Sequence, residues 1–383
     1  MSPSPPGQHR TDRPIAEIAR GWAVDERLRR LVPGFDAPFF QAGLAGYSDG
    51  AMRLVARRHG CPYCVTEALL DQTLISGGKG RTREDPDLLA SRGGAGGPRN
   101  RPEAAGCEDA ETTRALPGAG LHDHPIAGQI IGSDPGQMAE AASILLTMNY
   151  DVVDVNLACP VRKIRRRNRG GHLLAAPDEA IAILEAVRRA VPEDVPLTVK
   201  MRRAYDDSPR QAEHFHRIFD AAYDLGYAWA TVHCRTVVQK YEGPSRWEFL
   251  VDLVKRHPDR LILGSGDIWT ARDIFAMLEV TGVSAVAVAR GCIGNPWIFR
   301  QARQLMSGRP PEGPTLAEQR RALLDHFDLS MRLWGERAAS RMMRKFGIRF
   351  AMHHPDGEAV KAAFITCRTA AEWRGVIERH YSQ

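Results

Sequence analysis

The stretch IAGQIIGSDPGQMAEAASILLTMNYDVVDVN, residues 126–156, contains the repeating unit that decides the fold. It begins with an apolar run, Ile126–Ile131, and ends with a second one, Val152–Asn156. Short, often β-branched runs of this kind, followed by glycine or polar residues, are typical of buried strands. Between them, Pro135–Thr147 has a helical pattern with proline near its start. The stretch therefore predicts a strand, a helix and a second strand.

The same alternation continues along the chain of 383 residues. It predicts further helices at Pro177–Ala190, Pro209–Leu225 and Ala271–Val280. Eight strands that alternate with helices predict an α/β fold, the closed (β/α)₈ TIM barrel of about 250 residues. A doubly wound sheet is the alternative, although no GxGxxG motif follows the first strand. The eight expected strands are Ala37–Ala42, Tyr63–Thr66, Ile126–Ile131, Val152–Asn156, Leu197–Met201, Ala230–His233, Leu261–Gly264 and Ala285–Ala289.

Composition limits the class of protein and its partners. The hydrophobic content of 43% and the charged fraction of 26% exclude a disordered chain. A net charge of +6 favours a polyanionic partner such as nucleic acid, although an arginine-rich composition from a GC-rich genome explains it equally well. The seven cysteines are scattered and follow no secretory signal, which predicts reduced thiols and a cytoplasmic protein. No apolar run reaches about 18 residues, so no membrane span is expected.

Three parts are predicted: an N-terminal extension over residues 1–35, the barrel over residues 36–310 and a helical domain over residues 311–383. The proline-containing start, Met1–Pro14, is interpreted as a loose tail and not a signal peptide. The helices expected in the third part are Leu316–Trp334, Arg337–His353 and Glu358–His380.

Two segments around the second strand depart from this pattern. Ala90–His124 is rich in glycine, proline and alanine and has no period, so we interpret it as a mostly disordered insertion. Gly77–Gly80 fits either an ordered active-site loop or a hinge. Cys61 and Cys64 form a CxxC pair, but no second pair completes four zinc ligands, so both are interpreted as structural and no metal is expected.

In barrel enzymes the chemistry lies where the strands end and the loops begin. Most of the predicted strands here are followed by polar residues or glycine, and convergence of that many polar groups is hard to explain by core packing. The segments concerned are Gln41–Gly46, Gln129–Pro135, Asn156–Pro160, Lys200–Arg202, His233–Thr236, Gly264–Asp267 and Ala289–Gly291.

One of these regions, DVNLACPVRKI at Asp154–Ile164, resembles the signature of the tRNA-dihydrouridine synthases. The resemblance covers roughly Ala37 to Arg303, with its motifs in the family's order. It implies a TIM barrel with FMN, NADPH as the reductant, and reduction of the C5=C6 bond of specific uridines in tRNA to dihydrouridine. The other matching motifs are Gly128–Pro135, His233–Thr236, Gln239–Gly243 with Trp247, Gly266–Ile268 and Arg290–Phe299.

Cys159 is the predicted catalytic residue. Reduction of uracil takes a hydride, which a flavin carries, and a proton, which the protein supplies. A thiol of ordinary pKa, ~8.5, is mostly protonated at neutral pH, so Cys159 is expected to act as a general acid. A small buried hydrophobic residue is the alternative for a single cysteine after a strand.

Cofactor contacts are predicted at the same strand ends. Lys200 is expected near the pyrimidine edge of the flavin, and Gln129 is expected to form a hydrogen bond with its ring. His233, Gly266 and Arg290 are expected to hold the phosphate. A solvated Lys200 and an inert core His233 are the alternatives. The predicted set also includes Gly43, Leu44, Ala45, Ser265, Asp267 and Ala289.

Substrate contacts are predicted around the same cysteine. Arg162 and Lys163 are expected to stabilise negative charge on the uracil carbonyls, and Asn156 to orient the base. Six of the eight residues from Arg162 to Arg169 are basic, so RNA phosphates are expected to bind there, at residues that include Arg165, Arg166 and Arg167. A solvated charged face is the alternative. A second RNA surface is expected on the C-terminal helices, at Arg337, Arg341, Arg344, Lys345 and Arg349, unless these helices only pack on the barrel.

Other functions remain possible at this stage. One is an FMN barrel oxidoreductase that acts on a small molecule, like dihydroorotate dehydrogenase. Another is a dihydrouridine synthase that acts on ribosomal RNA, and a third is a non-catalytic RNA-binding protein. A monomer that binds tRNA and no membrane is the form that we expect.

Overall fold

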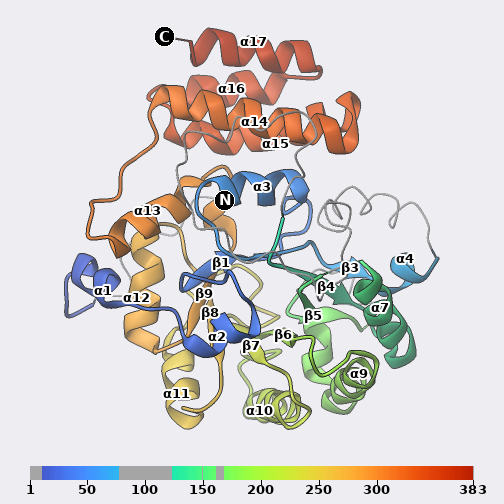
Figure 1. The fold of residues 1–383 in the computed structure, drawn as a ribbon. Helices are drawn as coiled ribbons and strands as arrows, with labels where there is room; N and C mark the ends of the chain where they lie inside the picture. The colour runs from blue at the N-terminus through green and yellow to red at the C-terminus, as the bar shows by residue number, and fades with distance from the viewer. Residues whose placement is uncertain (1–10, 77–122, 149, 161–167, 383) are drawn as a thin grey trace.

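The computed structural model describes residues 11–76, 123–148, 150–160 and 168–382. Its centre is a closed barrel of parallel strands, as predicted (Figure 1). Pairing of β2 with β4 and of β9 with β1 closes the ring, and the short β3 (Leu69–Leu70) adds to the end of β4. The strands of the ring are β1 (Phe39–Gln41), β2 (Cys64–Val65), β4 (Ile126–Ile131), β5 (Val152–Leu157), β6 (Leu197–Arg202), β7 (Trp229–His233), β8 (Ile262–Ser265) and β9 (Ala285–Val288).

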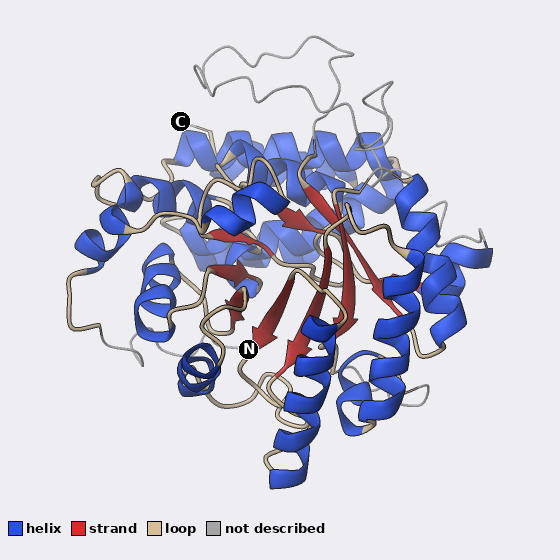
Figure 2. Cartoon of the chain, turned by 60° about the horizontal axis from the view of Figure 1, so that its bottom comes forward, coloured by secondary structure: helices blue, strands red, loops and turns tan. Residues whose placement is uncertain are grey.

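Helices surround the barrel (Figure 2). Three of them, α7, α9 and α10, begin with a proline at the first helical turn, where its missing N–H costs nothing. The predicted bounds of α7 and α9 are confirmed, while α10 and α12 each end one residue from the predicted end. The helices are α3 (Gly50–Arg58), α4 (Asp71–Ser76), α7 (Pro135–Thr147), α9 (Pro177–Ala190), α10 (Pro209–Asp224), α11 (Glu248–Arg256), α12 (Ala271–Thr281) and α13 (Trp297–Met306), with 3₁₀ turns η1 (Gly170–Ala175) and η2 (Arg290–Cys292).

The residues before β1 close the end of the barrel where the strands begin. The helix α1 (Ile15–Gly21) packs on α12 and α13. Leu28 of α2 (Glu26–Leu31) and Phe35 belong to an apolar cluster that also contains Tyr63 and Trp229. Catalytic groups are therefore confined to the opposite end, where the strands finish.

Two residues of the predicted disordered insertion are part of the ordered fold, so that prediction extends too far. Asp123 is buried and forms ion pairs of 2.7 Å with both Arg53 and Arg57 of α3. His124 contacts the Asp151 carboxylate through Nδ1 at 2.6 Å. Pairing with opposite charges offsets the free-energy cost of burying these side chains. Amino-acid composition alone does not reveal such pairs. The rest of Ala90–His124, and Gly77–Gly80, lie outside the described residues.

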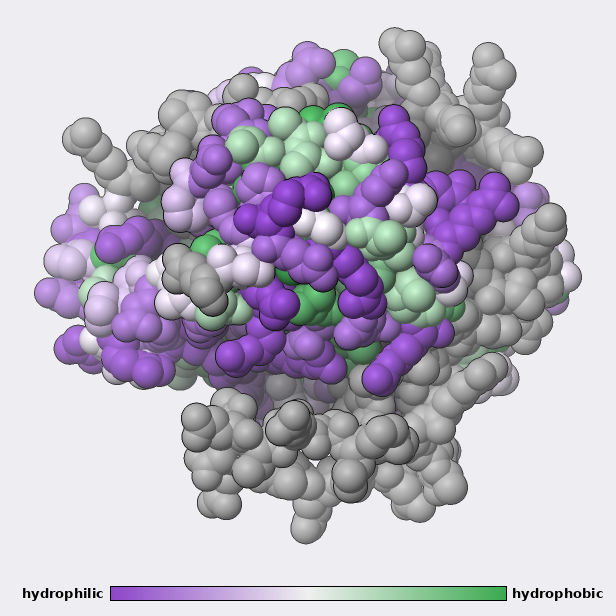
Figure 3. All heavy atoms as spheres, turned by 90° about the horizontal axis from the view of Figure 1, so that it is seen from above, coloured by the Kyte–Doolittle hydropathy of each residue, from purple (hydrophilic) through white to green (hydrophobic). Residues whose placement is uncertain are grey.

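The C-terminal helices stack above the barrel mouth (Figure 1). The prediction of one helix over Glu358–His380 is wrong, because the helix is interrupted. A second helix begins after Thr369, which forms a capping box with Glu372. Seen from above, the outer face of this stack is largely hydrophilic (Figure 3). The elements are α14 (Leu316–Trp334), α15 (Glu336–Phe350), η3 (Ala351–His353), α16 (Gly357–Thr366) and α17 (Ala370–His380).

Two contacts fix this stack to the loop after β1. Trp334 Nε1 donates to the Asp49 carboxylate at 3.0 Å, and Lys345 Nζ donates to the Gly46 carbonyl at 2.7 Å. Among the described residues, no helix is long and apolar enough to cross a membrane.

Candidate functional site

Strand register brings the predicted polar residues together at one end of the barrel. Gln129, Asp154 and Thr198 are neighbours across β4, β5 and β6. Two residues further along the strands, Asn156 lies beside Lys200. These residues, except Asn156, line a small cavity between the strands together with residues from other strands. Its lining includes Ala42, Gly43, Gln129, Asp154, Thr198, Lys200, Thr231 and Ala287.

Cys159 lies directly after β5 and is held by its backbone. Its N–H donates to Asn156 Oδ1 at 3.0 Å, and its carbonyl accepts from the Gly171 N–H at 3.0 Å. Gly170 has a φ of +58°, and a side chain there would meet Cys159 Cβ at 3.1 Å. The Cys159 side chain is partly exposed, whereas the other cysteines of the described chain are buried. The thiol is therefore partly exposed, while the backbone of Cys159 is held on both sides.

The hydrogen bonds that Asn156 forms in the structure are not the predicted contact with the base. Besides the two N–H groups of Ala158 and Cys159, it binds Gln129, because Asn156 Nδ2 donates to Gln129 Oε1 at 2.6 Å. Only 8% of Asn156 is exposed. In this structure it positions the cysteine loop, and its contact with a base stays a prediction.

Lys200 is a half-buried cation that lines the cavity. Burial and the neighbouring Arg202 lower the pKa of its ammonium group to about 8. Asp154 and the Cys159 thiol oppose this shift, which places Lys200 close to the loop that carries Cys159. In the part of the chain that the structure describes, no hydrogen bond or ion pair engages Lys200 Nζ. Its contact with a cofactor stays a prediction.

Arg202 is a site residue that the sequence analysis did not assign. Its Nε donates to the Ala158 carbonyl at 2.8 Å, and Nη1 donates to the carbonyls of Thr236 and Lys240. Burial lowers its pKa to about 10, and the Tyr241 and Cys159 side chains oppose that shift. No acceptor among the described residues binds Nη2. Its place two residues after Lys200 in β6 was the only available signal, because strand residues two apart share a face.

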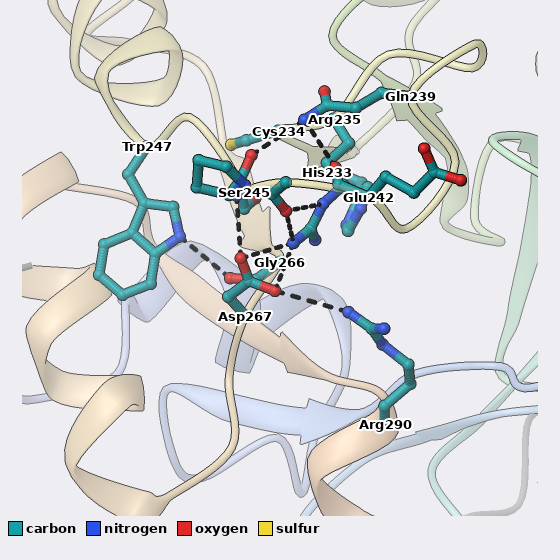
Figure 4. A network of polar contacts seen from close by, with 12 residues as sticks. His233, Cys234, Arg235, Gln239, Glu242, Ser245, Trp247, Gly266, Asp267 and Arg290 are labelled. Carbon is teal, nitrogen blue, oxygen red and sulfur yellow. Dashed lines mark hydrogen bonds and ion pairs between the residues drawn. The ribbon is translucent and has the colours of Figure 1, made fainter. Parts of the chain in front are cut away.

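His233 and the end of β8 form the other side of the site (Figure 4). His233 Nδ1 lies 3.4 Å from Ser265 Oγ, and its buried Nε2 has no partner within the described chain. Burial and the nearby cations hold the pKa of His233 well below its usual range, so the ring is neutral at pH 7. Gly266 has a φ of +128°, and a Cβ there would lie 2.0 Å from Ser245 Oγ.

Asp267 organises this loop through its carboxylate (Figure 4). The carboxylate accepts from Arg235 Nη2 at 2.7 Å and from the Ser245 N–H at 2.9 Å, and it forms an ion pair of 3.5 Å with Arg290. Arg290 Cζ also lies 4.8 Å from the centre of the Trp269 ring. Asp267 thus holds Arg290 in place, and its own contact with a cofactor stays a prediction. The predicted neighbour Ala289 directly precedes η2.

The loop after β1 approaches β2 too closely for a side chain. A Cβ on Gly43 would lie 2.3 Å from the Thr66 carbonyl and 3.4 Å from Gln129 Oε1. The Leu44 N–H donates to Ser48 Oγ at 2.7 Å, while Ala45 is exposed. These features, with the unpartnered His233 nitrogen and Lys200, fit a flat cofactor that carries an anionic group.

Most of the predicted basic run cannot be placed. Arg162, Lys163, Arg165, Arg166 and Arg167 lie outside the described residues. Arg169 of the same run is buried and forms an ion pair of 3.2 Å with Asp71.

The structural interpretation of Cys61 and Cys64 fits their surroundings. Both are buried free thiols, with Sγ atoms 3.8 Å apart. No group of three or more His, Cys, Asp or Glu side chains suited to a metal occurs among the described residues.

The sequence is similar to several known tRNA-dihydrouridine synthases. The chain is 32% identical to tRNA-dihydrouridine synthase B of Shewanella oneidensis over 256 residues, which are 67% of this chain and 77% of that protein. It is 31% identical to tRNA-dihydrouridine synthase B of Xanthomonas campestris over 322 residues, covering 84% and 86%. Among solved structures, the 6-hydroxypseudooxynicotine amine oxidase of Pseudomonas geniculata shares the fold, with a TM-score of 0.51 and 12% identity over 82% of this chain and 53% of that one.

The family described as dihydrouridine synthase matches residues 106–379, more than half of the sequence. This match covers the strand ends that carry Gln129, Cys159, Lys200, His233 and Arg290, and excludes only β1 and β2 of the ring. The chain belongs to the dihydrouridine synthase family.

Proposed function

We propose that this protein is a tRNA-dihydrouridine synthase that reduces the C5=C6 bond of specific uridines in tRNA, with FMN as cofactor and NADPH as reductant. The observation that supports this best is the partly exposed Cys159 thiol, with its backbone held at two points, beside the half-buried Lys200 and the buried Arg202. A thiol supplies a proton and cations stabilise negative charge, which are the two demands that uracil reduction makes on a protein.

Residues at both ends of the site fit FMN. Gly43, Gln129 and Lys200 line one small cavity, so a flat ring bound there would contact all three, with Lys200 at its pyrimidine edge. His233 offers an unpartnered ring nitrogen, and Arg290 offers a positive charge, so both suit the phosphate. When bound, FMN supplies the hydride, a reaction that no amino acid side chain performs.

The protein's own contribution is a proton and a positively charged pocket. Cys159 donates its thiol proton to a carbon of the uracil double bond, and its two backbone anchors keep Sγ in one region. Arg202, together with Arg162 and Lys163, stabilises the negative charge that develops on the uracil carbonyls, while Lys200 faces the flavin. The burial of Arg202 strengthens its interaction, because charges interact more strongly where water is excluded.

RNA would approach over the C-terminal helices and the mouth of the barrel. The exposed basic residues of α15 recur every four positions and lie on one side of the helix, where Lys345 contacts the loop after β1. Arg349 lies close enough to Arg290 to contribute to lowering its pKa, after the larger effects of burial and Arg235. This row and the run of residues 162–167 would bind phosphates, while the target base leaves its stack to reach Cys159.

The test is a reconstituted reaction. The purified protein with FMN and NADPH should form dihydrouridine in an unmodified tRNA transcript, measured by mass spectrometry of the nucleosides. Ribosomal RNA and free pyrimidines should give no product under the same conditions. Product only on ribosomal RNA or on a small pyrimidine would replace the proposed substrate, and a protein that binds no flavin would contradict the proposal. We further propose that the enzyme is a monomer in the cytoplasm, with the domain bounds given above.

A further inference from the structure

A chain of hydrogen bonds runs from the barrel interior to the catalytic loop, and it starts at a buried carboxylate. Asp154 is 5% exposed and accepts from Thr198 Oγ1 at 2.6 Å and from Gln129 Nε2 at 2.6 Å. Gln129 Oε1 in turn accepts from Asn156 Nδ2 at 2.6 Å. Asn156 Oδ1 then accepts from the Ala158 and Cys159 N–H groups, each at 3.0 Å.

The direction of every bond in this chain is fixed by its two ends. Burial raises the pKa of the Asp154 carboxyl, while the hydrogen bonds from Thr198 and Gln129 favour its ionised form. That ionised carboxylate only accepts hydrogen bonds, so the NH₂ group of Gln129 must face Asp154. A backbone N–H only donates, so the oxygen of Asn156 must face Cys159. The Asp154 end and the Cys159 end each fix the orientation of both amides, and both ends give the same orientation. Such agreement determines the orientation of each amide group from the network itself.

The orientation has consequences on two sides of the site. It gives the Cys159 backbone N–H its acceptor, which holds the thiol loop in place. It also turns the Gln129 oxygen, and not its NH₂ group, toward the space beside Gly43. Reversal of Gln129 would set two NH₂ groups against each other at Asn156, and Asn156 would have to turn away from Cys159.

We propose that Asp154 is a positioning residue that sets the orientation of Gln129 and Asn156 and, through them, the position of Cys159. This inference rests on the proposed function for its kinetic consequence, while the network stands on the geometry alone. Asp154 touches no reacting atom in this account. What matters is that it accepts a hydrogen bond from Gln129, and not that it carries a negative charge near Lys200.

Substitutions separate these two properties of Asp154. Asp154→Leu removes both the acceptor and the charge. Asp154→Asn removes only the charge, because its amide oxygen can face Gln129 while its NH₂ group donates to the Thr198 hydroxyl. Thr198→Val leaves the bond between Gln129 and Asp154 intact.

The expected kinetic effects follow the hydrogen bond and not the charge. Asp154→Leu should lose about 10²-fold in kcat for dihydrouridine formation, the cost of misplacing a reacting group by about 1 Å. Its KM for tRNA should stay within about twofold of the parent value, because phosphate contacts set most of that binding. Asp154→Asn and Thr198→Val should each lose less than about threefold. If Asp154→Asn is as slow as Asp154→Leu, the charge matters and the proposal is wrong.

A second readout needs neither flavin nor RNA. Alkylation of Cys159 by iodoacetamide, followed by mass spectrometry of the Cys159 peptide, reports how firmly the loop is held. The rate should rise at least about threefold in Asp154→Leu, and in neither of the other two variants, because only a loop without its anchor opens further. Equal rates in all four proteins would overturn the proposal even if the reaction on tRNA proceeds. A parent protein that forms no dihydrouridine would contradict the proposed function and leave this comparison valid. Melting temperatures identify any variant that fails to fold, and Asp154→Ala then replaces Asp154→Leu.

Discussion

At the scale of single residues, Cys159 differs from the other described cysteines in exposure and in anchoring. No hydrogen bond joins the thiol to the predicted cofactor residues that the structure describes, so Cys159→Ala should keep both its fold and its bound flavin. NADPH should still reduce that flavin at a near-normal rate. Oxidation of the reduced enzyme by tRNA should slow by roughly 10²–10⁴-fold, the usual effect of a general acid.

Stopped-flow absorbance of the two half-reactions measures this effect. Cys61→Ala serves as the matched control, because Cys61 is a buried thiol away from the loop after β5. An unchanged rate of oxidation by tRNA in Cys159→Ala would mean that another group donates the proton.

Lys200 gives a prediction about pH. Its pKa of about 8 means that the ammonium group is charged below that pH and neutral above it. Flavin affinity should therefore fall about tenfold as the pH rises through 8, since a charged hydrogen bond is lost. Lys200→Arg should move this loss to higher pH, because guanidinium groups keep their proton.

Fluorescence titration with FMN between pH 6 and 10, in a Cys159→Ala background, excludes any contribution from the Cys159 thiol. A parent affinity that is constant over this range would show that Lys200 does not contact the flavin.

At the scale of elements, α15 carries Arg337, Arg341, Lys345 and Arg349 at a spacing of four residues. Lys345 is already bonded to Gly46, which leaves three arginines of this row for RNA. Their combined replacement by alanine should weaken tRNA binding and flatten the dependence of log K on log salt by roughly 2–3, because about 0.7–0.9 is lost for each phosphate contact.

Filter binding at several salt concentrations tests this prediction. The control replaces Arg320, Arg321 and Arg332 of α14, which are equally exposed and change the net charge by the same amount. Equal slopes for the two triple variants would mean that the row on α15 is only a solvated face.

At the scale of the whole molecule, several histidines are buried in neutral form where the barrel meets the C-terminal helices. Burial lowers the pKa of His59 and His353 to about 4 and that of His326 to about 3. The unfolded chain, with histidine pKa values near ~6.5, binds more protons than the folded one below that pH. Stability is therefore complete above about pH 6.5 and is lost as the pH falls toward 4, by up to about 1.4 kcal/mol per pH unit for each histidine.

Urea denaturation at several pH values between 7 and 4.5 measures this slope. His326→Leu removes one of the titrating groups. The change of its free energy of unfolding with pH should therefore be smaller by the contribution of one histidine. An equal slope in the variant and the parent would mean that protonation of His326 is not coupled to unfolding.

The amino-acid sequence by itself determined the barrel and its order of strands. The alternation of apolar runs and helical patterns is local information, and proline at a helix start marks α7 within a few residues. Cys159, Lys200 and His233 were predicted from the sequence at or near the ends of barrel strands, and the structure places them there, while their roles stay predictions. The same local signals could not show that Asp123 is buried, since its partners Arg53 and Arg57 lie 70 and 66 residues away.

Only the tertiary structure decided what each polar group does. Arg202 has no motif of its own, and its role came from bonds to Ala158, Thr236 and Lys240, which closure of the barrel brings together. Asn156 holds the backbone of Cys159, a contact that its sequence position did not show, while its predicted contact with a base stays a prediction. The physical reason is that a hydrogen bond depends on distance and direction between groups far apart in the sequence, whereas periodicity records only which face of an element a residue occupies.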